Sequence, residues 1–199
     1  MQAAERIGKG RDFVAGAWTR SPAWARLPHS GDRAGSALYA GPMSEPSVLF
    51  VCLGNICRSP LAEAAFRQEA QRAGLAVTVD SAGTGNWHVG NPPDSRARDQ
   101  ALREGVDISA YRARQVSRAD FTRFSHIFAL DANNLADLRK LRPADATAHL
   151  GLLLDVVPGW EGRSVADPYY GGPEDFAQTW GEVTQAARAL VAQLRADPR

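Results

Sequence analysis

The chain carries, at residues 48–63, the stretch Val48-Leu-Phe-Val-Cys-Leu-Gly-Asn-Ile-Cys-Arg-Ser-Pro-Leu-Ala-Glu63. Its beginning belongs to an apolar run over residues 47–52, which is typical of a buried strand. A Gly-Asn turn follows, and both residue types tolerate a positive φ. Ser59 and Pro60 then predict a helix start, with Ser59 as the N-cap and Pro60 at the first helical position. The stretch therefore predicts a strand, a tight loop and a helix in immediate succession.

Outward from this stretch, short apolar runs alternate with helical patterns. The first helix is expected to run to about Gly74, and Gly105 and Pro143 are expected to follow the ends of two later helices. Further strands are expected over residues 75–79, 126–130 and 148–154, and further helices over residues 94–104, 132–141 and 174–196. Strands that alternate with helices predict an α/β fold with a parallel sheet.

The N-terminal part, residues 1–45, has a different character. It is rich in Gly and Pro, mildly basic and without a sustained helical or strand period. Such a composition predicts a disordered or irregular extension ahead of a domain over residues 46–199. An equally good interpretation is that the natural start is Met43.

The composition excludes several classes of protein. The 199 residues include 23 Lys and Arg against 22 Asp and Glu, a net charge of +1, which argues against a general nucleic-acid binder. No run approaches the 18 or so apolar residues of a transmembrane helix, and no secretory signal is evident. The 2 cysteines do not make a disulfide scaffold. A cytoplasmic protein with reduced thiols is expected.

The loop after residue 52 has the properties of an anion site. In open α/β sheets, ligands bind beyond the carboxyl ends of the strands. A helix N-terminus presents free backbone N–H groups and the positive end of the helix dipole. Gly54 and Asn55 allow the loop to curl into a cradle, whereas the Gly-Lys-Ser/Thr ending of a nucleotide-binding P-loop is absent. We therefore expect a phosphate site made mostly of backbone.

Three side chains give this cradle a chemistry. The N–H groups that bind phosphate would also stabilise a Cys52 thiolate as a nucleophile. Arg58 offers a planar fork for two phosphoryl oxygens, and Ser59 can donate a hydrogen bond that makes the thiolate a better leaving group. Taken alone, Cys52 could be a buried strand-end cysteine and Arg58 a surface charge. The complete Cys-x5-Arg-Ser-Pro string between a strand and a helix favours catalysis.

These residues closely resemble the phosphate loop of low-molecular-weight protein tyrosine phosphatases. The resemblance spans about residues 46–196. It continues through Ser81-Ala-Gly-Thr84, Gly90-Asn-Pro-Pro-Asp94, Ala113-Arg-Gln-Val116, Ala129-Leu-Asp131 and Asp167-Pro-Tyr-Tyr-Gly171. It implies a three-layer α/β fold of the phosphotyrosine phosphatase I-like type, with a four-stranded parallel sheet flanked by helices.

The resemblance also implies a two-step mechanism without metal or cofactor. Cys52 attacks phosphorus and forms a phosphocysteine, and Asp167 protonates the leaving group and then activates water. Without the resemblance, Asp167 would more readily be an Asx-turn or cap residue. The implied activity is hydrolysis of phosphotyrosine and small aryl phosphates, with acid phosphatase-like activity.

The remaining site residues follow from the same resemblance. The substrate would contact the loop residues Leu53, Gly54, Asn55, Ile56 and Cys57, and its ring would stack between Trp87 on one side and Tyr169 and Tyr170 on the other. Asn55 would also hold the loop backbone, with Ser81 in support. Asp131 would lie behind the site, although helix N-cap is an equally good role. Cys57 is either a redox partner of Cys52 or simple loop packing.

The chain departs from the family pattern in one place and has a variable residue in another. Family members often carry His just before the Ala-Arg-Gln segment, where this chain has Tyr111 and Arg112. His88 follows Trp87 in a variable loop, so substrate preference cannot be transferred.

Three alternative functions differ in the residues that they require. A phosphoarginine phosphatase would tend to have Thr where Ile56 stands. An arsenate reductase with a cysteine relay would need cysteines after Cys57, and none follows it, so that relay is excluded unless an outside thiol substitutes. A phosphate-binding module without catalysis would be expected to lack Cys52, Arg58 or Asp167, and all three are present.

The expected partners follow from this interpretation. They are a phosphotyrosine-containing protein or a small aryl phosphate, with inorganic phosphate as the product. No nucleic acid, membrane or metal is expected, and the chain is expected to be a monomer or a weak dimer.

Overall fold

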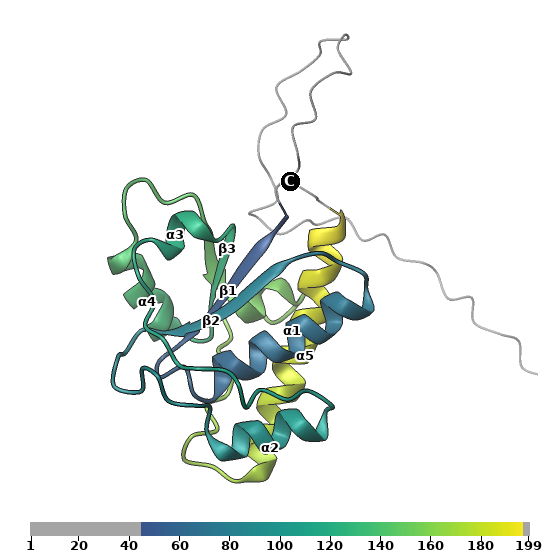
Figure 1. Ribbon diagram of the computed structural model, residues 1–199. Helices are drawn as coiled ribbons and strands as arrows, with labels where there is room; N and C mark the ends of the chain where they lie inside the picture. Colours follow the sequence, from purple (N-terminus) through teal and green to yellow (C-terminus); the bar gives the residue numbers. More distant parts are fainter. Residues whose placement is uncertain (1–44, 197–199) are drawn as a thin grey trace, which may run out of the picture. The chain divides into compact units, whose positions relative to one another are not determined.

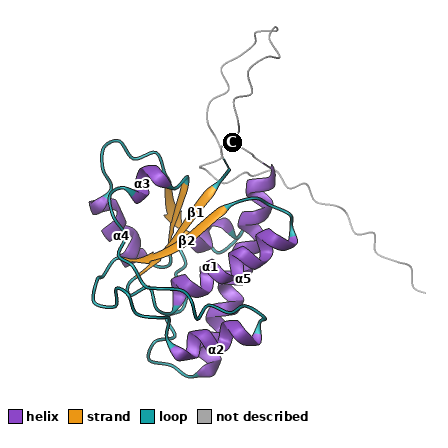
Figure 2. Ribbon diagram, viewed as in Figure 1, coloured by secondary structure: helices purple, strands orange, loops and turns teal. Residues whose placement is uncertain are grey.

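The computed structural model describes residues 45–196 as an α/β domain with three layers (Figures 1 and 2). The extension expected over residues 1–45 lies outside the described residues except for Glu45. The elements follow in the order β1 (Ser47–Cys52), α1 (Arg58–Arg72), β2 (Thr78–Gly83), α2 (Ser95–Arg103), α3 (Asp120–Arg123), β3 (His126–Ala129), α4 (Ala132–Leu141), β4 (His149–Leu152), the 3-10 helix η2 (Leu153–Val156) and α5 (Pro173–Ala196).

The sheet has four strands in the order β2-β1-β3-β4, and every neighbouring pair is parallel. Helices α1, α2 and α5 cover one face, and α3 and α4 cover the other (Figure 2). Because β1 is central and covered on both faces, its residues after Ser47 are all buried. This explains why its sequence is a continuous apolar run. The predicted four-stranded parallel sheet is confirmed.

Two hydrophobic cores lie on the two faces of the sheet. On the α1 and α5 face, Phe50 packs edge-on against Phe66, with 5.6 Å between ring centroids. The apolar face of α5 belongs to the same core, which makes α1 and α5 the main cover of this side. On the other face, Phe121 and Phe124 pack beneath α4 with Leu138. The two cores hold the carboxyl ends of β1 and β3 side by side, and the site lies there.

The start of α1 differs from the prediction. The helix begins at Arg58 with Cys57 at the N-cap, and no side chain caps it. The Ser59 hydroxyl contacts the Cys52 sulfur instead, so it does not serve as the N-cap. Pro60 is accommodated in the first turn because the first four N–H groups of a helix have no partner within the helix.

Two strand boundaries and one short helix also differ from the prediction. The predicted second strand is present, but its bounds, residues 75–79, are wrong: β2 covers Thr78–Gly83, since the chain first turns at Gly74, with φ of 64°, and then pairs in register with β1. The strand predicted over residues 148–154 is shorter, because its last residues form η2. The short helix α3 was not predicted. The helices expected over residues 94–104, 132–141 and 174–196 are confirmed within one residue or two.

Among residues 45–196, we find no helix with both the length and the apolar character that crossing a membrane requires.

Candidate active site

The phosphate loop, residues 52–59, connects the end of β1 to the first turn of α1. Asn55 adopts a left-handed conformation, with φ of 55°. The end of β2 closes on the loop from the side: a Cβ on Gly83 would lie 2.8 Å from the Leu53 carbonyl oxygen and 3.2 Å from the Asn55 nitrogen. Only a glycine allows this approach, and the curled backbone is therefore fixed by its neighbouring strand as well as by its own turn.

Cys52 lies at the floor of the loop, where its side chain is buried. Its Sγ is 3.0 Å from the Ser59 hydroxyl, and the Asn55 backbone N–H donates to it at 3.3 Å. Both contacts hold the sulfur in place at the bottom of the loop. The predicted contact between Cys52 and Ser59 is present.

Asn55 holds the loop through all of its side-chain hydrogen-bonding atoms. Its Nδ2 donates to the hydroxyl oxygens of Ser59, at 2.9 Å, and of Ser81, at 3.0 Å. Its Oδ1 accepts from the backbone N–H of Arg114 at 2.9 Å. Asn55 is buried and is not among the residues that line the substrate pocket. Its position favours the loop-holding role over direct substrate contact.

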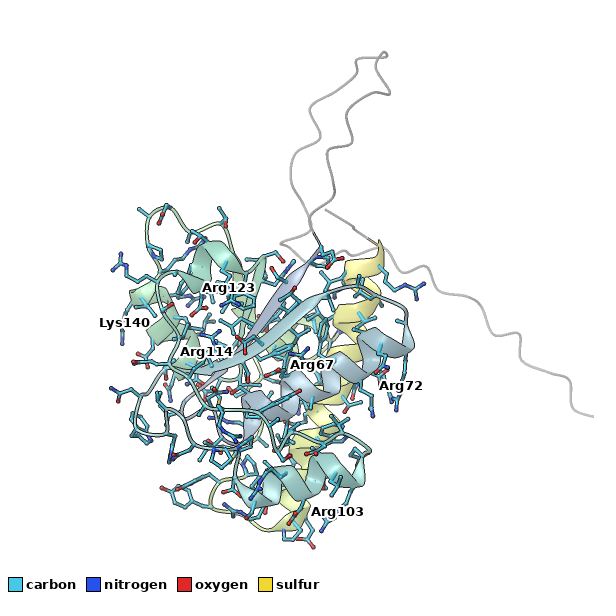
Figure 3. All side chains as sticks on the ribbon, viewed as in Figure 1. Arg67, Arg72, Arg103, Arg114, Arg123 and Lys140 are labelled. Atoms are coloured by element: carbon cyan, nitrogen blue, oxygen red, sulfur yellow. The ribbon has the colours of Figure 1, made fainter. Side chains whose placement is uncertain are left out.

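Behind Ser81 lies a buried acid that the sequence reasoning did not single out. The Ser81 hydroxyl donates to Glu63 Oε2 at 2.7 Å, and Arg67 pairs with Glu63 Oε1 at 2.8 Å. Figure 3 shows Arg67 at the side of α1 that lies next to β2, where its Nη2 also donates to the Val79 carbonyl at 2.6 Å. Burial raises the pKa of Glu63 in spite of these partners. A charged residue within the apolar start of α1 was the signal that could have found it.

Arg58 is almost entirely buried and is held between two carboxylates. Its Nη1 lies 2.7 Å from Asp131 Oδ2, and its Nη2 lies 2.8 Å from Asp167 Oδ2. Asp131 also caps α4, because its Oδ1 accepts from the backbone N–H of Asn134 at 2.7 Å. Both roles expected of Asp131 are therefore seen. Asp131 orients the guanidinium from within the protein, while Asp167 meets it at the pocket.

Asp167 comes from a distant part of the chain, the loop before α5. Its side chain is 48% exposed, which leaves it open to a bound substrate. Its Oδ1 also accepts from the Tyr169 backbone N–H at 3.1 Å, which is an Asx turn. The structural role and the position facing the site are thus combined in one carboxylate.

A pocket of about 290 Å³ opens above Cys52. Its walls include three predicted aromatic side chains: Trp87 is 62% exposed, Tyr169 41% and Tyr170 98%. The rings of Tyr169 and Tyr170 meet edge to face at 5.0 Å. The pocket is lined by Cys52, Leu53, Gly54, Ile56, Cys57, Arg58, Trp87, His88, Asp167, Tyr169 and Tyr170.

His88 is the lining residue that the predicted set lacked. Its ring lies beside the phosphate loop, since a Cβ on Gly54 would be 3.0 Å from His88 Cδ2. The only sequence signal was its position next to Trp87.

Cys57 contacts the same pocket from the end of the loop. It is a buried free thiol, as is Cys52. Burial raises the pKa of Cys57, and the nearby Asp94 raises it further. Cys57 is therefore poorly suited to act as a thiolate nucleophile in this state.

No three or more His, Cys, Asp or Glu side chains of residues 45–196 gather as ligands of a metal ion would.

Comparisons with known proteins agree with this geometry. A family model described as "Low molecular weight phosphotyrosine protein phosphatase" matches residues 47–199. A protein of that name from Schizosaccharomyces pombe is 44% identical over 150 residues, which cover 74% of this chain and 96% of the relative. The crystal structure of YfkJ from Bacillus subtilis has a TM-score of 0.73 and 41% identity, and the match covers 80% of this chain and 100% of YfkJ. The crystal structure of DARP, drosophila arginine phosphatase, has a TM-score of 0.71 and 30% identity, over 75% of this chain and 98% of that chain. The matched residues and the arrangement of the site lead to one conclusion: the chain belongs to the low molecular weight phosphotyrosine protein phosphatase family.

Proposed function

We propose that this chain hydrolyses phosphotyrosine and small aryl phosphates through a phosphocysteine intermediate. One observation carries the proposal: Cys52, Arg58 and Asp167 surround a single pocket whose outer walls are aromatic. A nucleophile at the floor, a cation beside it and an acid near the opening are the groups that in-line transfer of a phosphoryl group from a phenol requires.

In the first step, the Cys52 thiolate attacks phosphorus. A sulfur–phosphorus bond forms as the bond from phosphorus to the phenolic oxygen breaks. Asp167 gives its proton to that oxygen, so a neutral phenol leaves. The Arg58 Nη2 that now pairs with Asp167 turns to the phosphoryl oxygens, while Asp131 keeps Nη1 in place.

In the second step, water hydrolyses the phosphocysteine. Asp167, now ionised, accepts a proton from the water as its oxygen attacks phosphorus. The sulfur–phosphorus bond breaks, and its electrons return to Cys52 as a thiolate. The Ser59 hydroxyl, 3.0 Å from Sγ, donates to the leaving sulfur, and inorganic phosphate is released.

The aromatic walls support an aryl substrate. A phenyl ring that enters between Trp87 and Tyr169 would stack on apolar faces, whereas the flexible, polar side chain of phosphoarginine would gain less there. Ile56 adds a bulky apolar surface to the same wall. Phosphoarginine stays the second candidate, because one structural neighbour is named an arginine phosphatase.

The free thiols support action in a reducing compartment such as the cytoplasm, since oxidation of Cys52 would remove the nucleophile. We keep the monomer or weak dimer as the proposed state.

The proposal is tested by the pH dependence of kcat/KM with p-nitrophenyl phosphate, with and without EDTA. We expect turnover that EDTA does not change. Cys52→Ser should abolish it while keeping affinity for inorganic phosphate, because the cradle is mostly backbone. Asp167→Ala should lower kcat/KM by about 10²–10⁴-fold for a phenol that needs protonation, and should lose the decline towards high pH.

Near-normal turnover by Cys52→Ser would contradict the proposed nucleophile. If the reduced wild-type protein hydrolyses phosphoarginine but not aryl phosphates, the second candidate is correct. If it binds phosphate and hydrolyses neither compound, it is a binding module.

The proposed catalytic unit begins near residue 46. Deletion of residues 1–42 should therefore change kcat/KM by less than about twofold, because the described residues already supply the phosphate loop and the lining of the pocket. A large loss on truncation would mean that the extension takes part in the site.

A further inference from the structure

The loop that carries Asp167 is held on its upstream side by α5. Glu182 Oε2 accepts from the Ala166 backbone N–H at 2.9 Å, and the Thr179 hydroxyl donates to the Ala166 carbonyl at 3.0 Å. These contacts fix the residue just before Asp167. They do not fix the direction in which the chain leaves it.

On the downstream side, the loop is held by one side chain from α2. Arg96 Nη1 donates to the Gly171 carbonyl at 2.9 Å, and its Nη2 donates to the Tyr169 carbonyl at 3.0 Å. Among the hydrogen bonds of the described residues, these two join α2 to the segment from Asp167 to Gly171. The segment is therefore held on both sides, upstream by α5 and downstream by Arg96.

Arg96 is itself rigidly held. Its Nε and Nη2 donate to the two carboxylate oxygens of Asp94 at 3.0 and 2.9 Å. Its guanidinium lies over the Phe176 ring, 4.8 Å from the centroid. Asp94 in turn donates its backbone N–H to the Ile56 carbonyl at 2.8 Å, which is part of the phosphate loop. A continuous set of contacts thus joins the phosphate loop to the Asp167 loop.

We propose that Arg96 is a positioning residue that sets Asp167 over the leaving-group oxygen by fixing the loop of residues 167–171 relative to the phosphate loop. Arg96 does not line the pocket, so it acts through the loop and not on the substrate. The proposal rests on the function proposed above. It uses the planar fork of arginine, which meets Asp94 and two carbonyls together; lysine, with one nitrogen, cannot do so.

The test compares substrates that differ in their need for a proton. Phenyl phosphate has a poor leaving group that needs protonation, and 2,4-dinitrophenyl phosphate has a good one that does not. Arg96→Lys should lower kcat/KM for phenyl phosphate by about tenfold or more, and for dinitrophenyl phosphate by less than about twofold. In the Asp167→Ala background, Arg96→Lys should cause no further loss on phenyl phosphate beyond about twofold.

The matched control is Arg103→Ala on the same helix, where the side chain is exposed and points outward (Figure 3). It should leave both substrates unchanged. The proposal is overturned if Arg96→Lys lowers both substrates equally, if it leaves both unchanged, or if its effect adds fully to that of Asp167→Ala.

Folding is checked by a cooperative thermal transition, and the integrity of the phosphate loop is checked by the Kd for inorganic phosphate, which should match wild type. If Arg96→Lys lacks a native transition, Asp94→Asn takes its place. It removes the charge that holds the guanidinium, and asparagine is an equally good N-cap for α2. The same substrate-dependent loss is expected, and equal losses overturn the proposal. A wild-type protein without turnover on dinitrophenyl phosphate would instead refute the proposed function.

Discussion

The phosphate loop and the loop of Asp167 form one site, yet they are built in opposite ways. The phosphate loop has a buried floor, formed by Cys52, Asn55 and Ser59, and hydrogen bonds through Asn55 and Ser81 join it to a neighbouring strand. The Asp167 loop is largely exposed, and it carries Tyr170 at 98% exposure. Bonds to phosphorus need a cradle that does not rearrange, whereas leaving groups differ in size and need a wall that is open to solvent. This difference predicts that substitutions in the phosphate loop lower both the free energy of unfolding and kcat/KM. Substitutions in the exposed aromatic wall of the Asp167 loop should change substrate binding alone.

Among the variants that compare the two loops, Arg58→Lys is expected to have the largest effect, because Arg58 lies where the loops meet. Lysine cannot keep its bond to Asp131 and also present a second donor to the phosphoryl group. We expect kcat/KM for p-nitrophenyl phosphate to fall by about 10²–10³-fold. Arg72→Lys, at an exposed position on the same helix (Figure 3), is the control and should match wild type. Equal activity in both variants would contradict the role of the guanidinium fork.

Asn55→Ala should show the rigidity of the phosphate loop. It removes three hydrogen bonds and places alanine at a φ of 55°. The free energy of unfolding in urea should fall by about 2–3 kcal/mol, and kcat/KM should fall with it. Asn55→Gly relieves the backbone strain but not the lost bonds, so it should recover about 1 kcal/mol. A stable Asn55→Ala protein would mean that Gly83 and the helix alone hold the loop.

Tyr170→Ala should show the opposite behaviour of the second loop. Because the side chain is almost fully exposed, the free energy of unfolding should change by less than about 0.5 kcal/mol. KM for aryl phosphates should rise by about three- to tenfold through lost stacking. The inhibition constant of inorganic phosphate, which has no ring, should stay the same. A parallel rise in that constant would show that Tyr170 supports the cradle after all.

Glu63→Gln gives the smallest effect and a distinct pH signature. Burial raises the pKa of Glu63 above its value in the unfolded chain. Its favourable contribution to the free energy of unfolding is therefore complete below the pKa of the unfolded chain, about 4.3. This contribution is lost as pH rises through the pKa of the folded protein. The stability of Glu63→Gln minus that of wild type should therefore increase as pH rises from about 4.5. Urea unfolding of both proteins across this range measures it, and a difference that stays constant with pH would contradict the raised pKa.

The two loops also differ in how well the sequence predicts their residues. Cys52, Asn55, Arg58 and Ser59 could be assigned from the sequence because they are contiguous, and a strand followed by a turn and a helix brings them together locally. The assignment of Ser59 as N-cap was wrong for a tertiary reason: its hydroxyl is engaged by the sulfur at the end of β1. The boundaries of β2 were wrong because the register with β1 selects them, and a local apolar run does not contain that information.

By itself, the sequence determined the α/β class, the curled loop at the end of β1 and the position in that loop of the cysteine proposed as the nucleophile. These depend on local preferences: an apolar run long enough for a buried strand, a residue that tolerates positive φ, and a helix start with free N–H groups. Only the tertiary structure decided that Asp131 and Asp167 share Arg58, that His88 lines the pocket and that Arg96 holds the Asp167 loop. Those contacts join distant segments of the chain. The order of the strands and the packing of α2 and α5 bring these segments together, and no single stretch of residues determines that order or that packing.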